Sequence, residues 1–424
     1  MKKTVWLLSA HLCLWGAAYA QSRPQQFMQA ASPASAGFSA ERLQKLDTFF
    51  QEMVDKGMAP NAVTFIAHKG KIVHYKAYGY RNLERQEPVR KDDIFRIASQ
   101  TKLITTIALM MLYEEGKFFL DDPLYKYMPA FGNAKVLVSY DRAKGTYETK
   151  PAATPVTIRQ LLSHSSGIPY DHPLDSVLFG KGIGLFGSLK NDRLEDLIAK
   201  VAQRPLVHEP GEKFTYGFNT DVAGRLVEIL SGMSLKDYFQ QKIFAPLGMK
   251  DTYFYLPPSK ASRLVELYAL TGTNSKLSLC PDSVARKFPI SGAQTLYLGG
   301  AGLVSTAADY ARICQLILNG GEFNGVRLLS RKTVDLITRN QIGDAWVWDR
   351  QDKFGLGFQI ITENSRYGDQ ATPGSLTWGG AYCSEHTIDP KEELIMLVFT
   401  NVYPYTYSVE FIHKFRILAY QALL

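Results

Sequence analysis

Both ends of the chain carry β-hairpin patterns, and this constrains the fold more than any other feature. Runs 62–67 and 71–78 are rich in β-branched and aromatic residues and flank the turn His68-Lys69-Gly70. Runs 386–389 and 394–400 flank Pro390-Lys391-Glu392 in the same way. Helical patterns fill much of the sequence between them. We therefore predict an α/β (α+β) fold, in which one antiparallel sheet is built from the N- and C-terminal segments and flanked by helices, with a mainly helical lobe inserted within about 110–290.

Helix signals support this arrangement. Ser39 can cap a helix that would bury Leu43, Leu46, Phe50 and Met53, and a closing helix over 407–423 would bury Phe411, Phe415 and Leu418. Capping boxes are predicted at Thr157–Gln160 and Thr306–Asp309, and a hairpin over 136–147. The glycines of 299–302 lack the Gly-Lys-Ser/Thr of a phosphate loop, and we expect a close backbone crossing there.

Composition excludes several classes of protein. The chain has 424 residues, of which 46% are hydrophobic and 21% charged, so it has enough apolar material for a large core and is not a disordered chain. Its formal charge of +8 comes from scattered basic residues. A nucleic-acid surface would cluster them, so we expect no nucleic-acid partner.

The N-terminus has the pattern of a secretory signal. Lys2 and Lys3 precede an apolar stretch over 5–15, and Ala18-Tyr19-Ala20 places small residues at a cleavage site before Gln21. We predict a signal peptide over 1–20, a flexible lead-in over 21–37 and a single catalytic domain over 38–424. The protein would then be periplasmic, with no stable membrane insertion after cleavage. The alternative is an uncleaved membrane anchor.

Cysteine and histidine usage gives no metal-site signature. The chain lacks Cys-x-x-Cys and His-Glu-x-x-His patterns, so we predict neither a metal nor an organic cofactor. After cleavage Cys280, Cys314 and Cys383 remain, which permit at most one internal disulfide and leave its existence open.

The predicted helix over 99–115 combines buried and reactive residues. Its apolar residues surround the whole helix, which is typical of a helix buried on every side. Ser99 and Lys102 share a face in its first turn. A buried lysine is shifted toward its neutral form or requires a specific partner, and beside a serine it can take up the proton when the hydroxyl attacks a carbonyl. Alternatively, Ser99 is a plain N-cap and Lys102 extends to the surface.

Two further patterns accompany this pair. Tyr216 follows a Pro-Gly turn and precedes an apolar helix, a position from which a phenol can point into a cleft, although a generic tyrosine more often packs in a core. Trp378-Gly379-Gly380-Ala381 precedes the C-terminal strands, and two glycines entering a strand indicate either a close approach of a ligand or a simple bulge.

The order and spacing of these motifs resemble the serine β-lactamase and penicillin-binding-protein superfamily, and within it the class C β-lactamases and family VIII carboxylesterases. The resemblance runs from about Phe38 to the C-terminus. It includes the connecting phrases Leu120-Asp121-Asp122-Pro123, Leu161-Leu162-Ser163-His164-Ser165-Ser166-Gly167, Pro210-Gly211-Glu212, Pro246-Leu247-Gly248-Met249 and Gly302-Leu303-Val304-Ser305-Thr306.

The resemblance implies a role for each motif. Ser99 would be the acylated nucleophile, Lys102 would accept or relay its proton, and Tyr216 would be the general base that then protonates the leaving group. The backbone N–H groups of Ser99 and Ala381 would form the oxyanion hole. Asn219, Trp378, Gly379 and Gly380 would contact substrate, whereas His164 would be structural.

The chain departs from the β-lactamase pattern at two positions. The third motif there usually begins with a lysine that helps to hold the substrate carboxylate, and here Trp378 stands in its place. Asn219 also falls one residue later than in the Tyr-x-Asn of class C enzymes. The missing charge should weaken anionic β-lactams and D-Ala-D-Ala peptides relative to neutral esters.

We therefore predict an exported serine hydrolase that cleaves small carboxylic esters through an acyl-enzyme, its partner being a small ester or amide substrate. One alternative is a β-lactamase or D-amino-acid peptidase on the same scaffold. A second is a catalytically silent peptidoglycan-binding relative.

Overall fold

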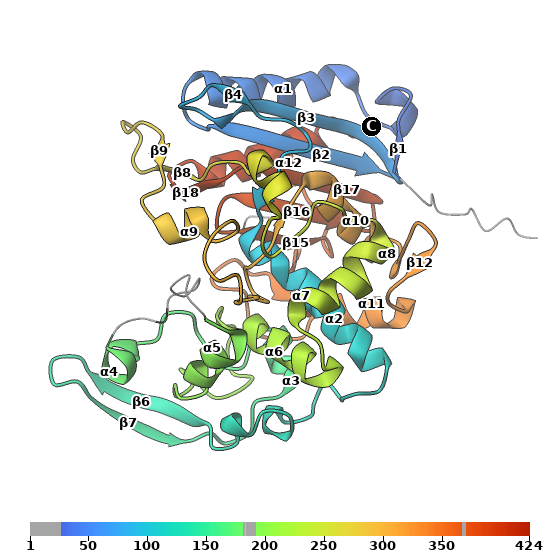
Figure 1. The fold of residues 1–424 in the computed structure, drawn as a ribbon. Helices are drawn as coiled ribbons and strands as arrows, with labels where there is room; N and C mark the ends of the chain where they lie inside the picture. Colours follow the sequence, from blue (N-terminus) through green and yellow to red (C-terminus); the bar gives the residue numbers. More distant parts are fainter. Residues whose placement is uncertain (1–26, 181–182, 184–191, 367–369) are drawn as a thin grey trace, which may run out of the picture.

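A large sheet drawn from both ends of the chain lies beside a helical region that carries a projecting hairpin (Figure 1). The computed structural model describes residues 27–180, 183, 192–366 and 370–424. The predicted signal peptide and the first part of the lead-in lie outside these residues. The mixed architecture confirms the predicted fold class.

The sheet has nine strands among the described residues. Only the β1–β3 pair is parallel, and every other neighbouring pair is antiparallel. In spatial order its strands are β1 (Met28–Gln29), β3 (Lys71–Asn82), β2 (Asn61–His68), β17 (Leu394–Phe399), β16 (Ser384–Asp389), β15 (Leu376–Gly380), β14 (Gln359–Ile360) and β13 (Lys353–Phe354), with β4 (Glu87–Pro88) paired to β3. Both predicted hairpins are confirmed, and the antiparallel pairing of β2 with β17 joins the two ends of the chain.

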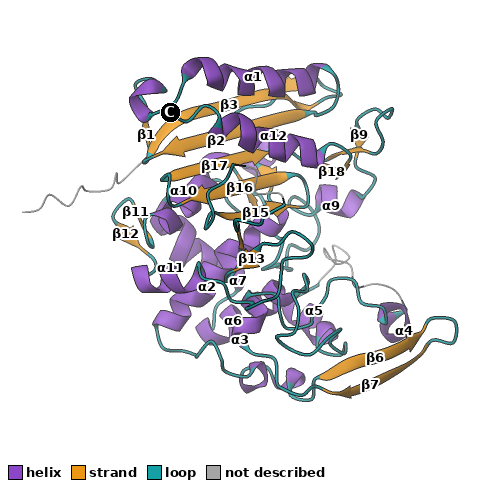
Figure 2. Ribbon diagram, turned by 180° about the vertical axis from the view of Figure 1, so that it is seen from behind, coloured by secondary structure: helices purple, strands orange, loops and turns teal. Residues whose placement is uncertain are grey.

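The central strands are buried on both faces. Because successive side chains of a strand point to opposite sides, each central strand contributes to two cores. On β2, Phe65 faces the core that contains α2 (Thr101–Glu114), whereas its neighbour Ile66 faces α1 (Ala40–Asp55) and α12 (Ser408–Tyr420). Leu397 and Met396 divide in the same way on β17. Figure 2 shows the sheet between these two helical layers. The sheet therefore forms the partition between two cores.

The terminal helices match their sequence patterns. The Ser39 side chain accepts from the Arg42 backbone N–H at the start of α1. The four predicted apolar residues of α1 are buried, and they pack against Phe411 and Phe415 of α12. This layer closes the face of the sheet that lies away from α2.

Residues 27–37 differ from the flexible lead-in that we expected. Phe27 packs edge-on against Phe65, with ring centroids 5.2 Å apart. β1 then adds a parallel edge to β3, and Ala34–Ala36 forms a short 3₁₀ helix. An aromatic anchor and an available sheet edge hold this segment in place despite its polar composition.

Most of the helices lie between the two halves of the sheet in the sequence. They are α3 (Ile158–Leu162), α4 (Asp175–Phe179), α5 (Leu194–Val201), α6 (Asn219–Ser231), α7 (Leu235–Phe239), α8 (Ala245–Leu247), α9 (Ser283–Lys287), α10 (Ala307–Leu318) and α11 (Arg331–Ile337). The predicted hairpin is present as β6 (Lys135–Asp141) and β7 (Thr146–Pro151), which projects from the helical region (Figure 1). The remaining short strands are β5 (Phe95–Arg96), β8 (Tyr268–Leu270), β9 (Ser278–Leu279), β10 (Val304–Ser305), β11 (Glu322–Phe323), β12 (Val326–Arg327) and β18 (Val402–Tyr405).

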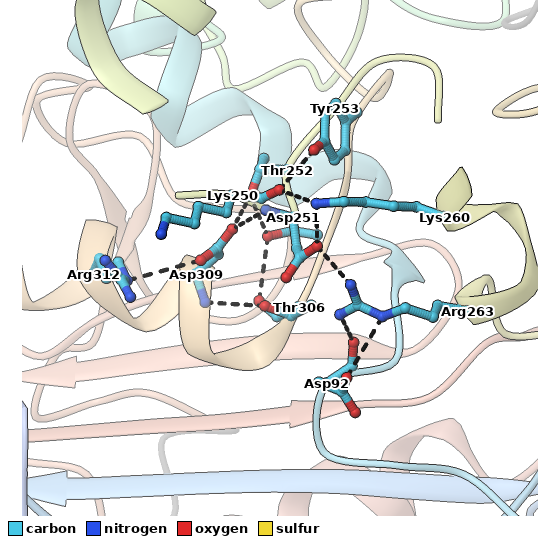
Figure 3. Close-up of polar contacts among 11 residues, drawn as sticks. Asp92, Lys250, Asp251, Thr252, Tyr253, Lys260, Arg263, Thr306, Asp309 and Arg312 are labelled. Atoms are coloured by element: carbon cyan, nitrogen blue, oxygen red, sulfur yellow. Dashed lines mark hydrogen bonds and ion pairs between the residues drawn. The ribbon is translucent and has the colours of Figure 1, made fainter. Parts of the chain in front are cut away.

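Only one of the two predicted capping boxes is complete. Thr157 and Gln160 exchange both hydrogen bonds at the start of α3. At α10, Thr306 accepts from the Asp309 backbone N–H, but the Asp309 carboxylate accepts from Asp251 and Thr252 instead of returning to Thr306 (Figure 3). The prediction of a second box was wrong because a tertiary contact takes the carboxylate.

The same contact continues into an ion-pair network. Asp251 accepts from Lys260 and Arg263 at 2.7 Å each, and Arg263 reaches the backbone carbonyl of Asp92 (Figure 3). Beside it the backbone of Ile94 bridges to Leu264. This network ties the loop after α8 to the segment that leads into β5 and Ser99.

Two properties of the described residues complete the fold. Cys280, Cys314 and Cys383 are buried and unpaired. Within the described ranges, no helix has both the length and the apolar character needed to cross a bilayer.

Candidate active site

The strand before Ser99 is fixed by a buried arginine. The Arg96 guanidinium donates to the carbonyls of Val265 at 2.7 Å and Ala285 at 3.2 Å. Asn401 bonds both the N–H and the C=O of Arg96, each at 3.0 Å. Burial lowers the pKa of Arg96 to about 10, which still leaves it charged at neutral pH. A charged group that satisfies carbonyls from several segments holds β5 rigidly in the core.

Ser99 lies on a strained turn. It belongs to a 3₁₀ turn, Ala98–Gln100, that runs directly into α2. Ala98 has a φ of 41°, in the left-handed region that alanine rarely adopts. Such strain persists only where the surroundings enforce it, and it is concentrated at functional sites. Ser99 is half-buried and lines a cleft, and it makes no N-cap bond to α2, unlike the plain capping role considered above.

Lys102 is fully buried and does not extend to the surface. Its Nζ atom donates to Gly300 O at 2.7 Å, Tyr170 OH at 2.9 Å and Ser99 Oγ at 3.3 Å. Three acceptors match the three protons of an ammonium group. A buried lysine requires a specific partner if it is to stay charged, and Lys102 has three.

Tyr216 approaches the same ammonium from another element. It lies in the loop before α6, and Lys102 Nζ is 4.5 Å from the centroid of its ring. Its ring also packs against Trp378 at 5.2 Å and Trp348 at 5.9 Å. A cation over an aromatic face is attracted to the ring electrons. The structure thus gathers Ser99, Lys102 and Tyr216 at one place.

The end of β15 lies against the turn that carries Ser99. A Cβ atom on Gly380 would stand 2.4 Å from the carbonyl oxygen of Ile97, so only glycine permits this approach. Ala381, which is exposed, follows in the turn between β15 and β16. Trp378, Gly379, Gly380 and Ala381 all line the cleft with Ser99.

The cleft has a volume of ≈ 340 Å³, at the small end for ligand sites. Its walls differ in character. One is aromatic, where Trp348 and Trp378 stack with centroids 5.8 Å apart. The lining also includes Arg350, Arg416 and Glu385, and Arg416 lies 3.6 Å from Glu385. The cleft therefore contains charged side chains, although Trp378 itself carries no charge.

Asn219 does not line this cleft, which differs from the substrate contact that we expected. It is fully buried, and its Nδ2 donates to Ile168 O at 3.0 Å while its Oδ1 accepts from Ser166. His164 is also structural, because its ring nitrogens contact Asn219 and Thr220. Burial, and then the charge of Lys102, lower the pKa of His164 well below its usual value.

The sequence analysis missed two residues that surround Lys102. Tyr170 contacts the ammonium directly, and Asp221 lies behind it as a buried carboxyl group. Nothing in the sequence distinguishes Tyr170 among 23 tyrosines. Asp221 offered no distinct signal either, because an acidic residue in the first turn of a helix is common.

Metal-ligating side chains do not gather in the described part of the chain: no group of three or more His, Cys, Asp and Glu could hold an ion there. The groups that meet around Lys102 are the hydroxyl of Ser99 and the phenols of Tyr170 and Tyr216.

Comparisons with known proteins agree with this geometry. The Beta-lactamase family model matches residues 46–419. Lovastatin esterase of Penicillium rubens is 30% identical over 380 residues, which cover 82% of this chain and 90% of that protein. Monacolin J acid methylbutanoyltransferase of Aspergillus terreus is 30% identical over 400 residues, which cover 87% of this chain and 93% of the relative.

A solved structure extends the likeness to three dimensions. EstCE1 is described as a hydrolase with promiscuous acyltransferase activity, and it superposes with a TM-score of 0.74 at 26% sequence identity. The superposition covers 90% of this chain and 98% of the EstCE1 chain. The family match spans most of the domain, and the fold and the serine site agree with it. This chain belongs to the β-lactamase family and is a serine hydrolase.

Proposed function

We propose that the protein is an exported esterase that cleaves small carboxylic esters through an acyl-enzyme on Ser99. The observation that carries this proposal is the contact of Ser99 Oγ with the buried ammonium of Lys102 at 3.3 Å, beside the Tyr216 ring and at the cleft. Nucleophile, proton-transfer groups and binding space are thus in one place, as nucleophilic catalysis requires.

In the proposed reaction, Ser99 Oγ bonds to the ester carbonyl carbon, and the carbonyl oxygen becomes an oxyanion. The backbone N–H groups of Ser99 and Ala381 stabilise that charge. With Lys102 as an ammonium, the base of the Lys102–Tyr216 pair is Tyr216 as a phenolate, which takes the serine proton and gives it to the leaving alcohol oxygen as the ester C–O bond breaks. A water molecule then attacks the acyl-serine and gives a proton to the same phenolate, which returns that proton to Ser99 Oγ as the acid leaves. Each group ends the cycle in its initial state.

Two observations favour esters over β-lactams. Trp378 stands where a substrate-binding lysine would be expected, and it packs against Tyr216, Trp348 and Phe354. An aromatic wall in a small cleft suits a short apolar acyl group. The names of lovastatin esterase, the methylbutanoyltransferase and EstCE1 also describe ester or acyl-transfer chemistry.

We predict that Ser99→Ala abolishes ester turnover and leaves the thermal unfolding temperature unchanged, because a methyl group fits where the half-buried hydroxyl stood. Hydrolysis of p-nitrophenyl butyrate and intact-mass detection of the acyl-enzyme measure this. Ser176→Ala, at an exposed position on α4, is the matched control and should keep full activity. Substantial turnover by Ser99→Ala would refute the assignment of the nucleophile.

Lys102→Ala and Tyr216→Phe should each slow acylation by about a hundredfold or more, since general acid–base groups contribute about 10²- to 10⁴-fold. Because the two groups act as one proton-transfer unit, the double variant should be little worse than either single variant. Rapid-mixing measurement of the acylation rate tests this. Fully additive losses would mean that the two residues act independently.

Trp378→Lys should raise activity on a carboxylate-bearing β-lactam, such as nitrocefin, relative to p-nitrophenyl butyrate. A partly exposed charge pair contributes about 1 kcal/mol, so the ratio should change by about tenfold or less. Removing a ring that packs against Tyr216 should lower both activities, so the ratio is the informative quantity. Trp378→Gln removes the ring without adding charge. If both variants shift the ratio equally, the shape of the cleft, and not charge, sets the preference.

Export is supported by the pattern of residues 1–20 alone: two lysines, an apolar stretch and a small-residue cleavage site. We predict that the protein expressed in a Gram-negative host is recovered from the periplasm with Gln21 as its first residue. Mass spectrometry of the recovered chain measures this directly. An intact N-terminus in the membrane fraction would indicate an uncleaved anchor instead.

A further inference from the structure

We propose that Tyr170 and Asp221 are positioning residues that hold the Lys102 ammonium against Ser99. The two tyrosines then have different roles: Tyr170 orients the lysine, and Tyr216 transfers the proton. This inference rests on the proposed function. Tyr170 contacts Lys102 directly, and Asp221 is connected to it through Gly300.

Only one of the two tyrosines, Tyr170, makes a hydrogen bond to Lys102 through its hydroxyl group. Tyr170 OH accepts a hydrogen bond from Nζ at 2.9 Å, whereas the contact with Tyr216 is made over its ring. The Tyr170 ring packs edge-on against Tyr216 and Phe218, with centroids 5.3 and 4.7 Å away, and the residue is half-buried. Tyr170 is therefore fixed in place and faces Lys102, whereas Tyr216 lines the cleft.

The carboxyl group of Asp221 is connected to the lysine through the backbone of Gly300. Asp221 is fully buried on α6, and its Oδ1 accepts from the Gly300 N–H at 2.9 Å. The carbonyl of the same residue, Gly300, accepts from Lys102 at 2.7 Å. One peptide segment thus connects the carboxylate to the ammonium, and the negative charge offsets the positive charge in a region that water does not reach.

The second carboxylate oxygen of Asp221 and the Tyr170 hydroxyl lie on the same side of Gly300. Asp221 Oδ2 is buried and has no hydrogen-bond partner among the described residues. A Cβ atom on Gly300 would stand 2.5 Å from Asp221 Oδ2 and 2.9 Å from Tyr170 OH, so both oxygens border the same point. The phenol accepts from Lys102 and keeps its own proton for donation. Asp221 Oδ2 lies on that side of the phenol without a hydrogen bond to it.

The charges of this cluster support the assignment. Burial raises the pKa of Asp221 to about 6, and the charge of Lys102 opposes that rise. Burial, then the charges of Asp221 and Tyr216, raise the pKa of Tyr170 well above its usual value, so this phenol stays protonated. The charged and titratable groups that act on Asp221 or are acted on by it are Lys102 from α2 and Tyr170 from the loop after α3. His164, near Lys102, stays neutral.

The sign of the pH effect follows from these charges. Above about pH 6 Asp221 is ionised and balances the ammonium; as the pH falls through that value it gains a proton and the balance is lost. Wild-type kcat should therefore fall on the acid side with a limb near pH 6. Asp221→Asn keeps the acceptor for Gly300 but cannot ionise, so its kcat should be low throughout and lack that limb.

The test measures kcat, KM and the pH profile for p-nitrophenyl butyrate in Tyr170→Phe and Asp221→Asn. Tyr170→Phe removes one oxygen atom and should lower kcat by about 10- to 100-fold with KM within about twofold. In a Lys102→Ala background the same change should have little effect, because the lysine that Tyr170 positions is gone.

Matched controls separate positioning from stability. Tyr255→Phe removes a half-buried phenol that donates to the carbonyl of Leu296 at 2.8 Å, and Asp389→Asn replaces a buried carboxyl group on β16; neither residue lines the cleft. Both should keep wild-type kcat and the wild-type acid limb.

Wild-type kcat in Tyr170→Phe, an unchanged acid limb in Asp221→Asn, or an equal loss in the controls would overturn the proposal. Full activity in Ser99→Ala would instead refute the proposed function, so the two failures are distinguishable.

Discussion

The burial of one ammonium group is the constraint on which the rest of the site depends. Lys102 lies in the first turn of a helix whose residues are almost all buried, where an unpaired charge costs several kcal/mol, of order 20 in the idealised limit. The fold meets this cost by bringing a serine hydroxyl, a phenol and a backbone carbonyl from three parts of the chain within hydrogen-bond distance. Because each donor proton has an acceptor, the ammonium has a fixed direction, and Ser99 lies along it.

The rest of the architecture supplies those acceptors. The sheet holds β15 beside the Ser99 turn, the helical region delivers Tyr170, Tyr216 and Asp221, and the glycine-rich segment at 299–302 passes between them. Gly300 contacts both residues: its carbonyl accepts a hydrogen bond from Lys102, and its N–H donates one to Asp221. A side chain at this position would collide with Asp221, so a glycine is required for Gly300 to bond both Lys102 and Asp221.

The backbone that leads into Ser99 is also held in place by hydrogen bonds. Arg96 is anchored by carbonyls of Val265 and Ala285, and Asn401 fixes its backbone. Ala98 then adopts a left-handed conformation that presents Ser99 to the cleft. Strain at one residue is maintained by hydrogen bonds at its neighbours, which is a common arrangement where a nucleophile must be exposed on a rigid support.

The sequence by itself determined the terminal hairpins, the two helices of the outer layer and the contact of Ser99 with Lys102. These depend on alternation, helical spacing and caps, which act over a few residues. Only the tertiary structure decided that Tyr170 and Asp221 adjoin Lys102, that Asn219 is buried away from the cleft, and that Asp309 binds Asp251 instead of completing a capping box. In each case the deciding contact joins residues remote in sequence, and no local pattern encodes which acceptor a buried charge will meet.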